Sequence, residues 1–174
     1  MEKFKAFLKR KDIVFSLSRY GIDARPFHET HQDIVWEMCD LRAWLNGEFR
    51  ERAFSEKEKK LIMVTRLETP GSAAQGTTGG DVTADRIFCL SAAEVREWLR
   101  EKSWRICEPT PYARSRNCRA GLNGASFWWL RNPGGLQNKA AGVGETGALS
   151  SGGNYADYAG AVVRPAMWIT VPEQ

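Results

Sequence analysis

The sequence predicts an α+β fold, because patterns typical of strands and of helices occupy separate parts of the chain. Residues 12–18 (D-I-V-F-S-L-S) have the branched, alternating pattern of a strand. Residues 33–45 carry apolar side chains at helical spacing, and the stretch from residue 121 onward combines apolar runs with glycine-rich turns. The 174 residues are 43% hydrophobic and 26% charged, which is sufficient for one domain with a buried core.

The first helix is predicted to begin at Asp33. Its apolar residues recur at steps of four, three and four, which places on one face Ile34, Met38, Leu41 and Leu45. The pair Asn46-Gly47 should end this helix, because both residues tolerate the left-handed conformation of a helix C-terminus.

Two capping boxes predict two further helices. Ser55 with Glu58 opens a short helix over residues 56–62, and Ser91 with Glu94 opens another. The core face of the latter should consist of Val95, Trp98 and Leu99. Between them, residues 68–81 contain four glycines and are predicted to form a long loop, and residues 86–90 are predicted to form a strand.

Charge and hydropathy limit the kinds of protein that this sequence can encode. The sequence holds no run of 18 apolar residues and no apolar segment behind its first residues, so neither a transmembrane span nor a signal peptide is predicted. We therefore expect the protein in the cytoplasm or in a phage particle. Residues 1–11 are interpreted as a basic leader and 12–174 as a single domain. The net charge of +4 is concentrated between residues 102 and 131, whose basic residues are Lys102, Arg105, Arg114, Arg116, Arg119 and Arg131.

Cysteine and histidine spacing predicts no metal site and no cofactor. The four cysteines include no C-x-x-C pair, and His28 and His31 are three residues apart instead of the four of a zinc-binding helix. We expect reduced thiols, with a disulfide between Cys107 and Cys118 left open for an oxidising compartment. No cluster of acidic residues between 132 and 161 calls for calcium.

Residues 132–161 are the candidate binding segment. They contain three charged residues, no Trp or Met, and many Gly, Ser, Ala, Asn and Tyr residues, a composition typical of adaptable binding loops; ordinary polar turns are the alternative. Tyr155 and Tyr158 are the expected hot spots. The predicted ligand-binding residues are Asn132, Asn138, Lys139, Glu145, Thr146, Ser150, Ser151, Asn154, Tyr155, Asp157 and Tyr158.

Large apolar residues flank this segment on both sides and predict a buried base. The expected buried tryptophans are Trp36 or Trp44, Trp128 or Trp129, and Trp168. Arg131 and Arg164 lie within the apolar motifs, so we assign them a structural role with a carboxylate or carbonyl partner, for which Asp40 and Asp85 are candidates.

Six ordered blocks between residues 17 and 171 resemble a family of unknown function common in gut bacteria. They include Y-G-I-D-A-R-P-F-H-E-T, G-T-T-G-G-D, P-T-P-Y-A, W-W-L-R-N-P-G and V-V-R-P-A-M-W-I. The last two blocks also resemble the C-terminal half of the C-type lectin fold in variable proteins of diversity-generating retroelements. This resemblance implies mixed small sheets with two to three helices, close termini, and a strand at Ile13–Leu17 paired with Trp168–Val171. The N-terminal strand pair of the family is expected to be shortened here to Ile13–Ser18.

The resemblance implies a ligand-binding scaffold and not an enzyme, with an unknown protein or glycan as partner. Retroelement diversification of an AAY asparagine codon cannot produce Lys, Glu, Gln, Met or Trp. These types make up 38 of the 174 residues, so thirty positions should hold six or seven, whereas residues 132–161 hold three. Two alternatives stay open: an enzyme related to formylglycine-generating enzymes, whose chemistry needs paired cysteines and a metal, and a nucleic-acid-binding module that uses residues 102–131. We do not expect nucleic acid as the partner.

Overall fold

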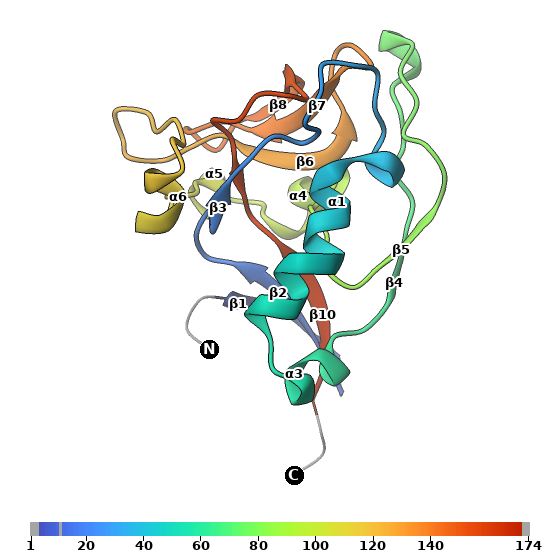
Figure 1. Cartoon of the computed structure of the whole chain (residues 1–174), viewed down its shortest axis with the longest axis vertical. Coiled ribbons are helices and arrows are strands. Elements are labelled where there is room, and N and C mark those ends of the chain that lie inside the picture. Colours follow the sequence, from blue (N-terminus) through green and yellow to red (C-terminus); the bar gives the residue numbers. More distant parts are fainter. Residues whose placement is uncertain (1–3, 11, 172–174) are drawn as a thin grey trace.

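Three small sheets and several short helices form a mixed α+β fold (Figure 1). The structure is a computed structural model that describes residues 4–10 and 12–171. A three-stranded antiparallel sheet has the order β1 (Phe4–Arg10), β2 (Ile13–Ser18), β10 (Ala166–Thr170). A five-stranded sheet has the order β3 (Asp23–Ala24), β9 (Val162–Val163), β6 (Trp128–Pro133), β7 (Lys139–Val143), β8 (Leu149–Tyr155). The third sheet pairs β4 (Thr65–Leu67) with β5 (Thr83–Asp85).

The predicted pairing of the N-terminal and C-terminal strands is confirmed. β2 and β10 run antiparallel, from Leu17 opposite Ala166 to Ile13 opposite Thr170. The two described chain ends nevertheless lie at opposite ends of this sheet, because Phe4 pairs with Ser18 whereas Thr170 pairs with Ile13. The fold therefore brings the N-terminal and C-terminal strands together, but it does not bring the two chain ends together.

The interpretation of residues 1–11 as a leader is wrong for residues 4–10. These residues form β1, which pairs with β2 over its whole length and contains one register shift between Ala6 and Leu8. The N-terminal strand pair is therefore not shortened. Frequent basic residues concealed the strand, because lysine is depleted in strands on average but is common on the edge strands of sheets.

The first helix differs from its prediction at both ends. It begins with the 3-10 turn η1 (Trp36–Met38), and α1 (Asp40–Trp44) continues through a π-helical turn η2 (Leu45–Phe49) into α2 (Arg50–Ala53). Gly47 does not adopt a left-handed conformation; it has φ −106° and ψ −106° and kinks the helix without ending it. Met38 is exposed, and Ile34, Leu41 and Leu45 are buried as predicted.

Residues 86–90 do not form the predicted strand, because a helix side chain takes the place of a strand partner. Asn46 accepts hydrogen bonds from the backbone N–H groups of Arg86 (2.8 Å) and Ile87 (3.2 Å) and donates to the Ile87 carbonyl (2.9 Å). Only Phe88 makes a ladder contact, with Ala166. Asn46 thus fixes the position of this segment beside the helix.

Both capping boxes are confirmed, in α3 (Glu56–Leu61) and α4 (Ala92–Trp98). Val95 and Leu99 are buried, and the half-buried Trp98 packs on Phe15 of β2 with ring centroids 4.7 Å apart. Two further short helices are α5 (Lys102–Arg105) and α6 (Pro111–Ser115). The predicted loop over residues 68–81 contains one 3-10 turn, η3 (Ala73–Gln75).

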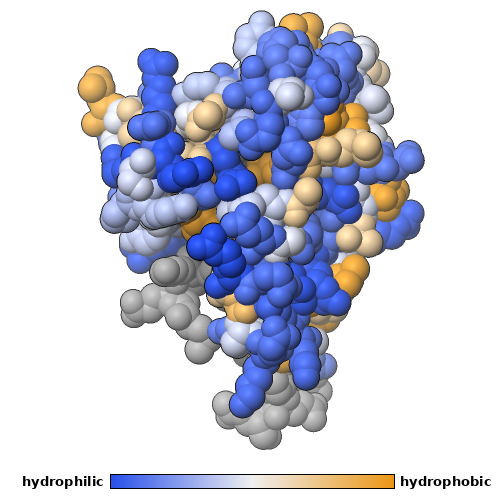
Figure 2. All heavy atoms as spheres, viewed as in Figure 1, coloured by the Kyte–Doolittle hydropathy of each residue, from blue (hydrophilic) through white to orange (hydrophobic). Residues whose placement is uncertain are grey.

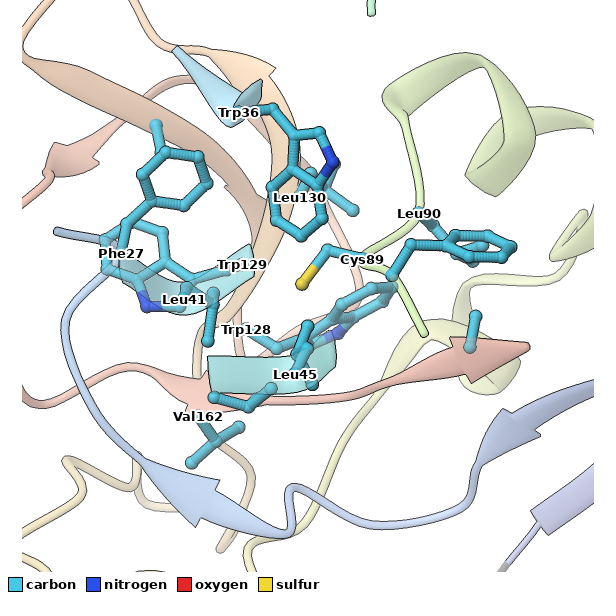
Figure 3. Packing of buried hydrophobic residues seen from close by; sticks show 14 of the residues in the cluster. Phe27, Trp36, Leu41, Leu45, Cys89, Leu90, Trp128, Trp129, Leu130 and Val162 are labelled. Carbon is cyan, nitrogen blue, oxygen red and sulfur yellow. The ribbon is translucent and has the colours of Figure 1, made fainter. Parts of the chain in front are cut away.

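The core joins the helical run to the larger sheet (Figure 3). Trp36, Trp128 and Trp129 are buried, and Trp168 remains partly exposed. Each buried indole N–H has an acceptor: the Asp85 carboxylate for Trp36, the Arg105 carbonyl for Trp128 and the Arg25 carbonyl for Trp129. Figure 1 shows the helical run from α1 through α2 descending from the level of β6 toward β2 and β10 at the lower end. Within the described residues, every helix is too short or too polar to span a bilayer.

Candidate functional site

The hairpin of β7 and β8 carries most of the predicted binding residues. Gly142 pairs with Ser150 and Ala140 with Asn154, so β8 has extra residues in the bulge between these pairs. Gly153 has φ +64°, and a Cβ there would lie 2.0 Å from the Ala140 carbonyl oxygen, so this position requires glycine. Gly152 has open space around it. The bulge therefore combines one fixed residue with an exposed neighbour.

Four predicted residues gather around a histidine that the sequence analysis did not assign to the site. His31 Nδ1 lies 3.2 Å from Asp157 Oδ1, and its Nε2 lies 3.1 Å from Asn138 Nδ2. The imidazole ring packs against Tyr155 with centroids 4.9 Å apart, and the Lys139 ammonium lies 4.5 Å from the Tyr155 ring centroid. This group of residues is called the His31 cluster below.

The His31 cluster offers several kinds of contact in one place. With the Asn138 amide as donor, His31 Nε2 is an acceptor, and the ring proton on Nδ1 is donated to Asp157. The exposed phenol of Tyr155 adds a flat apolar ring with a polar tip. Such a surface can stack on a planar or ring-shaped ligand group while it donates and accepts hydrogen bonds.

Backbone hydrogen bonds hold the His31 loop against the hairpin. The His28 N–H donates to the Ala156 carbonyl, and the Ile34 N–H donates to the Gln137 carbonyl. An Asp40 carboxylate oxygen lies 2.6 Å from Nδ1 of the His28 imidazole. No pattern within the sequence places His31 beside residues 132–161, because the pairing of Asp23–Ala24 with β9 just before this loop is a tertiary contact.

The other predicted residues divide into exposed and structural positions. Glu145 and Thr146 are exposed in the turn at the far end of the hairpin, and Ser151 is exposed in the bulge. Asn132 is structural: its Oδ1 accepts from the Ala92 N–H (2.7 Å) and its Nδ2 donates to the Pro70 carbonyl (3.0 Å). Besides Asn132, the half-buried predicted residues outside the His31 cluster are Ser150, Asn154 and Tyr158, of which Tyr158 packs against the core.

Arg131 and Arg164 are both buried, 3% exposed, as a structural role requires. The Arg131 guanidinium pairs with both carboxylate oxygens of Glu94, at 2.5 and 2.8 Å, so neither Asp40 nor Asp85 is its partner. Asp85 is instead bonded to Arg42 and Trp36. The sequence does not indicate the pair of Arg131 and Glu94, because Glu94 is explained there by its role in the capping box.

The model of a family described as a domain of unknown function (DUF6273) matches residues 5–171. The chain belongs to this family. The expected membership in a family of unknown function is confirmed, and β1 lies almost entirely within the matched residues. No curated protein and no solved structure matches the chain significantly.

Three of the four cysteines of this DUF6273 domain are buried free thiols, and Cys118 is half-buried and also free. Burial raises the pKa of Cys89 to about 12 and that of Cys107 to about 11, and burial also raises the pKa of Cys39. Such thiols are poor nucleophiles at neutral pH. No group of three or more His, Cys, Asp or Glu side chains within the described residues could hold a metal ion.

The basic residues between 102 and 131 do not form a free stripe. Arg131 is buried against Glu94, and Arg105 donates to the Leu99 and Arg100 carbonyls. Arg114 donates to the Gly124 carbonyl, and Arg116 lies 3.8 Å from the Asp23 carboxylate. Arg131 is buried and Arg105 is half-buried, whereas the other four basic residues remain exposed: Lys102, Arg114, Arg116 and Arg119. Part of the local positive charge therefore supports the loops, and part of it faces solvent.

A groove of about 1230 Å³ lies between the helical run and the α6 segment, away from the His31 cluster. Its lining includes Tyr20, Trp44, Phe49 and Tyr112, and the Arg25 guanidinium stacks on Trp44 at 4.1 Å. Figure 2 shows the face that carries α1 and α6: it is largely hydrophilic, with hydrophobic residues visible between the polar ones. Sequence analysis did not predict this groove, because its walls come from three distant segments.

Proposed function

We propose that this DUF6273 domain is a ligand-recognition protein whose binding face is the His31 cluster together with the bulge of β8. The observation that carries the proposal is the contrast between that face and its base. Tyr155, Asp157 and Ser151 are exposed, whereas Trp128 and Trp129 on β6, the strand next to the hairpin in the same sheet, are completely buried. A rigid base of this kind keeps binding side chains in position.

The proposed scaffold is a C-type lectin-like fold, and the proposed role is that of the variable protein of a diversity-generating retroelement. Residues 146–161 contain none of the five residue types that a mutated AAY codon cannot produce. In this stretch Gly152 and Ser151 have room for other side chains, whereas Gly153 does not. Exposed positions that tolerate replacement, set between fixed ones, are what such diversification requires.

The coding DNA tests the proposed diversification. We expect a nearby, asparagine-rich near-copy of the stretch that encodes residues 146–161, differing mainly at adenines, together with a reverse transcriptase gene. If the flanking DNA contains neither, the role in a diversity-generating retroelement is refuted, and the recognition proposal then depends on binding alone.

Binding is tested with a printed glycan array and a displayed peptide library, probed with the wild-type protein and with a Tyr155→Ala, Asp157→Ala, Tyr158→Ala variant. A specific hit that the variant loses while it stays folded supports the face. A variant with Lys57→Ala, Arg96→Ala and Glu97→Ala, all exposed and far from the His31 cluster in sequence, is the matched control and should retain the hit. Equal binding by both variants would show that the ligand binds at another part of the molecule.

A further inference from the structure

Arg164 is a buried cation with an unusual set of partners. Its Nε donates to the Ser18 carbonyl (2.8 Å), and its Nη1 donates to the carbonyls of Trp104 (3.2 Å) and Arg105 (3.4 Å). Its Cζ lies 5.0 Å from the centroid of the Trp128 ring. Among the described residues, no carboxylate lies within ion-pair distance of this guanidinium, and none accepts a hydrogen bond from Nη2.

Comparison with the other buried arginine, Arg131, shows that Arg164 lacks a carboxylate partner. Arg131 has the same exposed fraction and donates to two backbone carbonyls, but it also pairs with both oxygens of Glu94. Removing a charge from water costs several kcal/mol unless an opposite charge compensates it. For Arg164 this cost is evident in its pKa, which burial lowers. Arg131 is neutralised within the described chain, and Arg164 is not.

Arg164 borders a small cavity that suits an anion. The cavity has a volume of about 160 Å³ and is lined by Arg19, Tyr20, Ser103, Glu108 and Arg164, together with Trp104 and Ile106. Two arginines against one glutamate leave a net positive charge at its wall. The volume is several times what one water molecule needs.

We propose that this cavity is a binding site for a small oxyanion of the phosphate or carboxylate class. Nη2 of Arg164 and the Arg19 guanidinium supply the positive charge, and the Ser103 hydroxyl is a further donor. A planar guanidinium with free N–H groups matches the oxygens of either anion. The bound anion gives Arg164 the counter-charge that Glu94 gives Arg131.

The proposed site is independent of the His31 cluster. It is formed by residues around β2, the α5 segment and Arg164, and it shares Tyr20 and Glu108 with the large groove. No residue of the predicted binding segment 132–161 lines it. Failure of the recognition proposal therefore leaves the anion proposal intact, and the reverse also holds.

Inorganic phosphate and acetate are titrated separately into the full chain by calorimetry at constant ionic strength, with chloride as the reference anion. Saturable phosphate binding identifies the phosphate class, and stronger binding of acetate identifies the carboxylate class. Arg19→Gln should weaken the binding at least tenfold, and Ser103→Ala should weaken it by a smaller factor. Glu108→Gln should strengthen it several-fold, because it removes the one negative charge of the wall. Arg96→Gln, an exposed arginine on α4, is the control and should change nothing.

Arg164→Lys separates binding from folding, since lysine retains the charge and can still donate to backbone carbonyls. We expect this variant to melt cooperatively and to bind the anion at least tenfold more weakly. If the wild-type protein shows no saturable binding of either anion, or if Arg19→Gln and Glu108→Gln leave the binding unchanged, Arg164 has a structural role only and the proposal is wrong.

Discussion

At the scale of single residues, buried polar groups in this domain form specific pairs across distant parts of the chain. Trp36, Thr83 and Arg42 share the Asp85 carboxylate, and Glu94 serves both the α4 capping box and Arg131. Each of these groups would be costly to bury alone. The pairs therefore make the packing of the core specific, and removing one member should destabilise it more than removing both.

Arg131→Met tests the Glu94 pair. The change leaves the Glu94 carboxylate without its counter-charge, with only the Ser91 N–H as donor, and removes the Arg131 donors from the carbonyls of Cys89 and Glu68. We therefore expect a loss of about 3 to 5 kcal/mol in the free energy of unfolding. Glu94→Gln keeps the capping box while it removes the charge. In urea denaturation the double variant should lose less than the sum of the single losses. Additive losses would mean that the two side chains do not depend on each other.

Buried thiols predict alkaline destabilisation. Cys89 and Cys107 have pKa values raised to about 12 and about 11 in the folded protein, whereas unfolded thiols ionise near 8.5. The folded state thus retains protons that the unfolded state loses. The resulting stability is fully present below about pH 8.5 and is lost as the pH rises toward the folded values, by about 1.4 kcal/mol per pH unit for each thiol.

Urea denaturation between pH 7 and pH 10.5 measures this loss. All other titrating groups are the same in the wild type and the variant, so a difference in pH dependence reports on the replaced thiol. Cys89→Ala should be less stable overall, but its stability should fall less steeply above pH 9 than that of the wild type. An unchanged slope in Cys89→Ala would show that this thiol does not cause the alkaline loss.

At the scale of elements, contacts from other parts of the chain decide the backbone conformation of two turn-like pairs, Asn46-Gly47 and Gly152-Gly153. Asn46-Gly47 resembles a helix end, yet the helical run continues, because Asn46 is occupied by the backbone of residues 86 and 87. In β8, Gly152 and Gly153 are adjacent, yet only Gly153 has a positive φ. Contacts from other elements decide both cases.

Asn46→Ala tests the contact between the helix and the segment of residues 86–90. It removes the acceptor for the Arg86 and Ile87 N–H groups and the donor to the Ile87 carbonyl, so we expect a loss of about 2 to 4 kcal/mol in unfolding free energy. Lys57→Ala, an exposed change on α3, should cost less than about 0.5 kcal/mol. A comparably small loss for Asn46→Ala in urea denaturation would mean that water replaces the side chain.

The bulge of β8 predicts opposite results for adjacent glycines. Gly152→Ala should change the melting temperature little, because no atom lies within 4 Å of the new Cβ. Gly153→Ala should lower it clearly, since the new Cβ meets the Ala140 carbonyl and φ is +64°. Thermal melting of the two variants side by side provides the comparison. Equal melting temperatures would show that the bulge adapts and that Gly153 is not a fixed position.

At the scale of the whole molecule, the fold separates a structural end from an exposed face. The first and last strands share one sheet, whereas Lys139 and Tyr155 of the His31 cluster belong to β7 and β8 of the five-stranded sheet, at the upper end of the molecule in Figure 1. Changes on the exposed face should therefore have little influence on the unfolding of the whole.

The variant with Tyr155→Ala, Asp157→Ala and Tyr158→Ala tests this separation by calorimetric melting. We expect one cooperative transition, with a cost of about 0.5 kcal/mol at each of the exposed Tyr155 and Asp157. Tyr158 should cost more, because it is half-buried and packs against the core. Loss of cooperative folding would mean that the segment belongs to the core, and the recognition face would have to be abandoned.

The sequence alone determined the features that depend on local chemistry. Capping boxes specified α3 and α4, and apolar runs specified β2 and β10. Composition identified residues 132–161 as a polar segment, but only part of it is exposed, because strand β7 within it is largely buried. Each of these signals is contained within a few neighbouring residues, so it can be read without knowledge of the rest of the chain.

Only the tertiary structure decided which distant groups meet. It placed His31 against Asp157, gave Arg131 the Glu94 carboxylate instead of Asp85, and left Arg164 beside a small cavity with no carboxylate of the described residues within ion-pair distance. Spacing along the chain holds no information about such pairs, because the folding of the sheets brings together residues separated by tens of positions. The functional proposals rest on these pairs, and the core that supports them was predictable in outline because burial follows hydrophobicity.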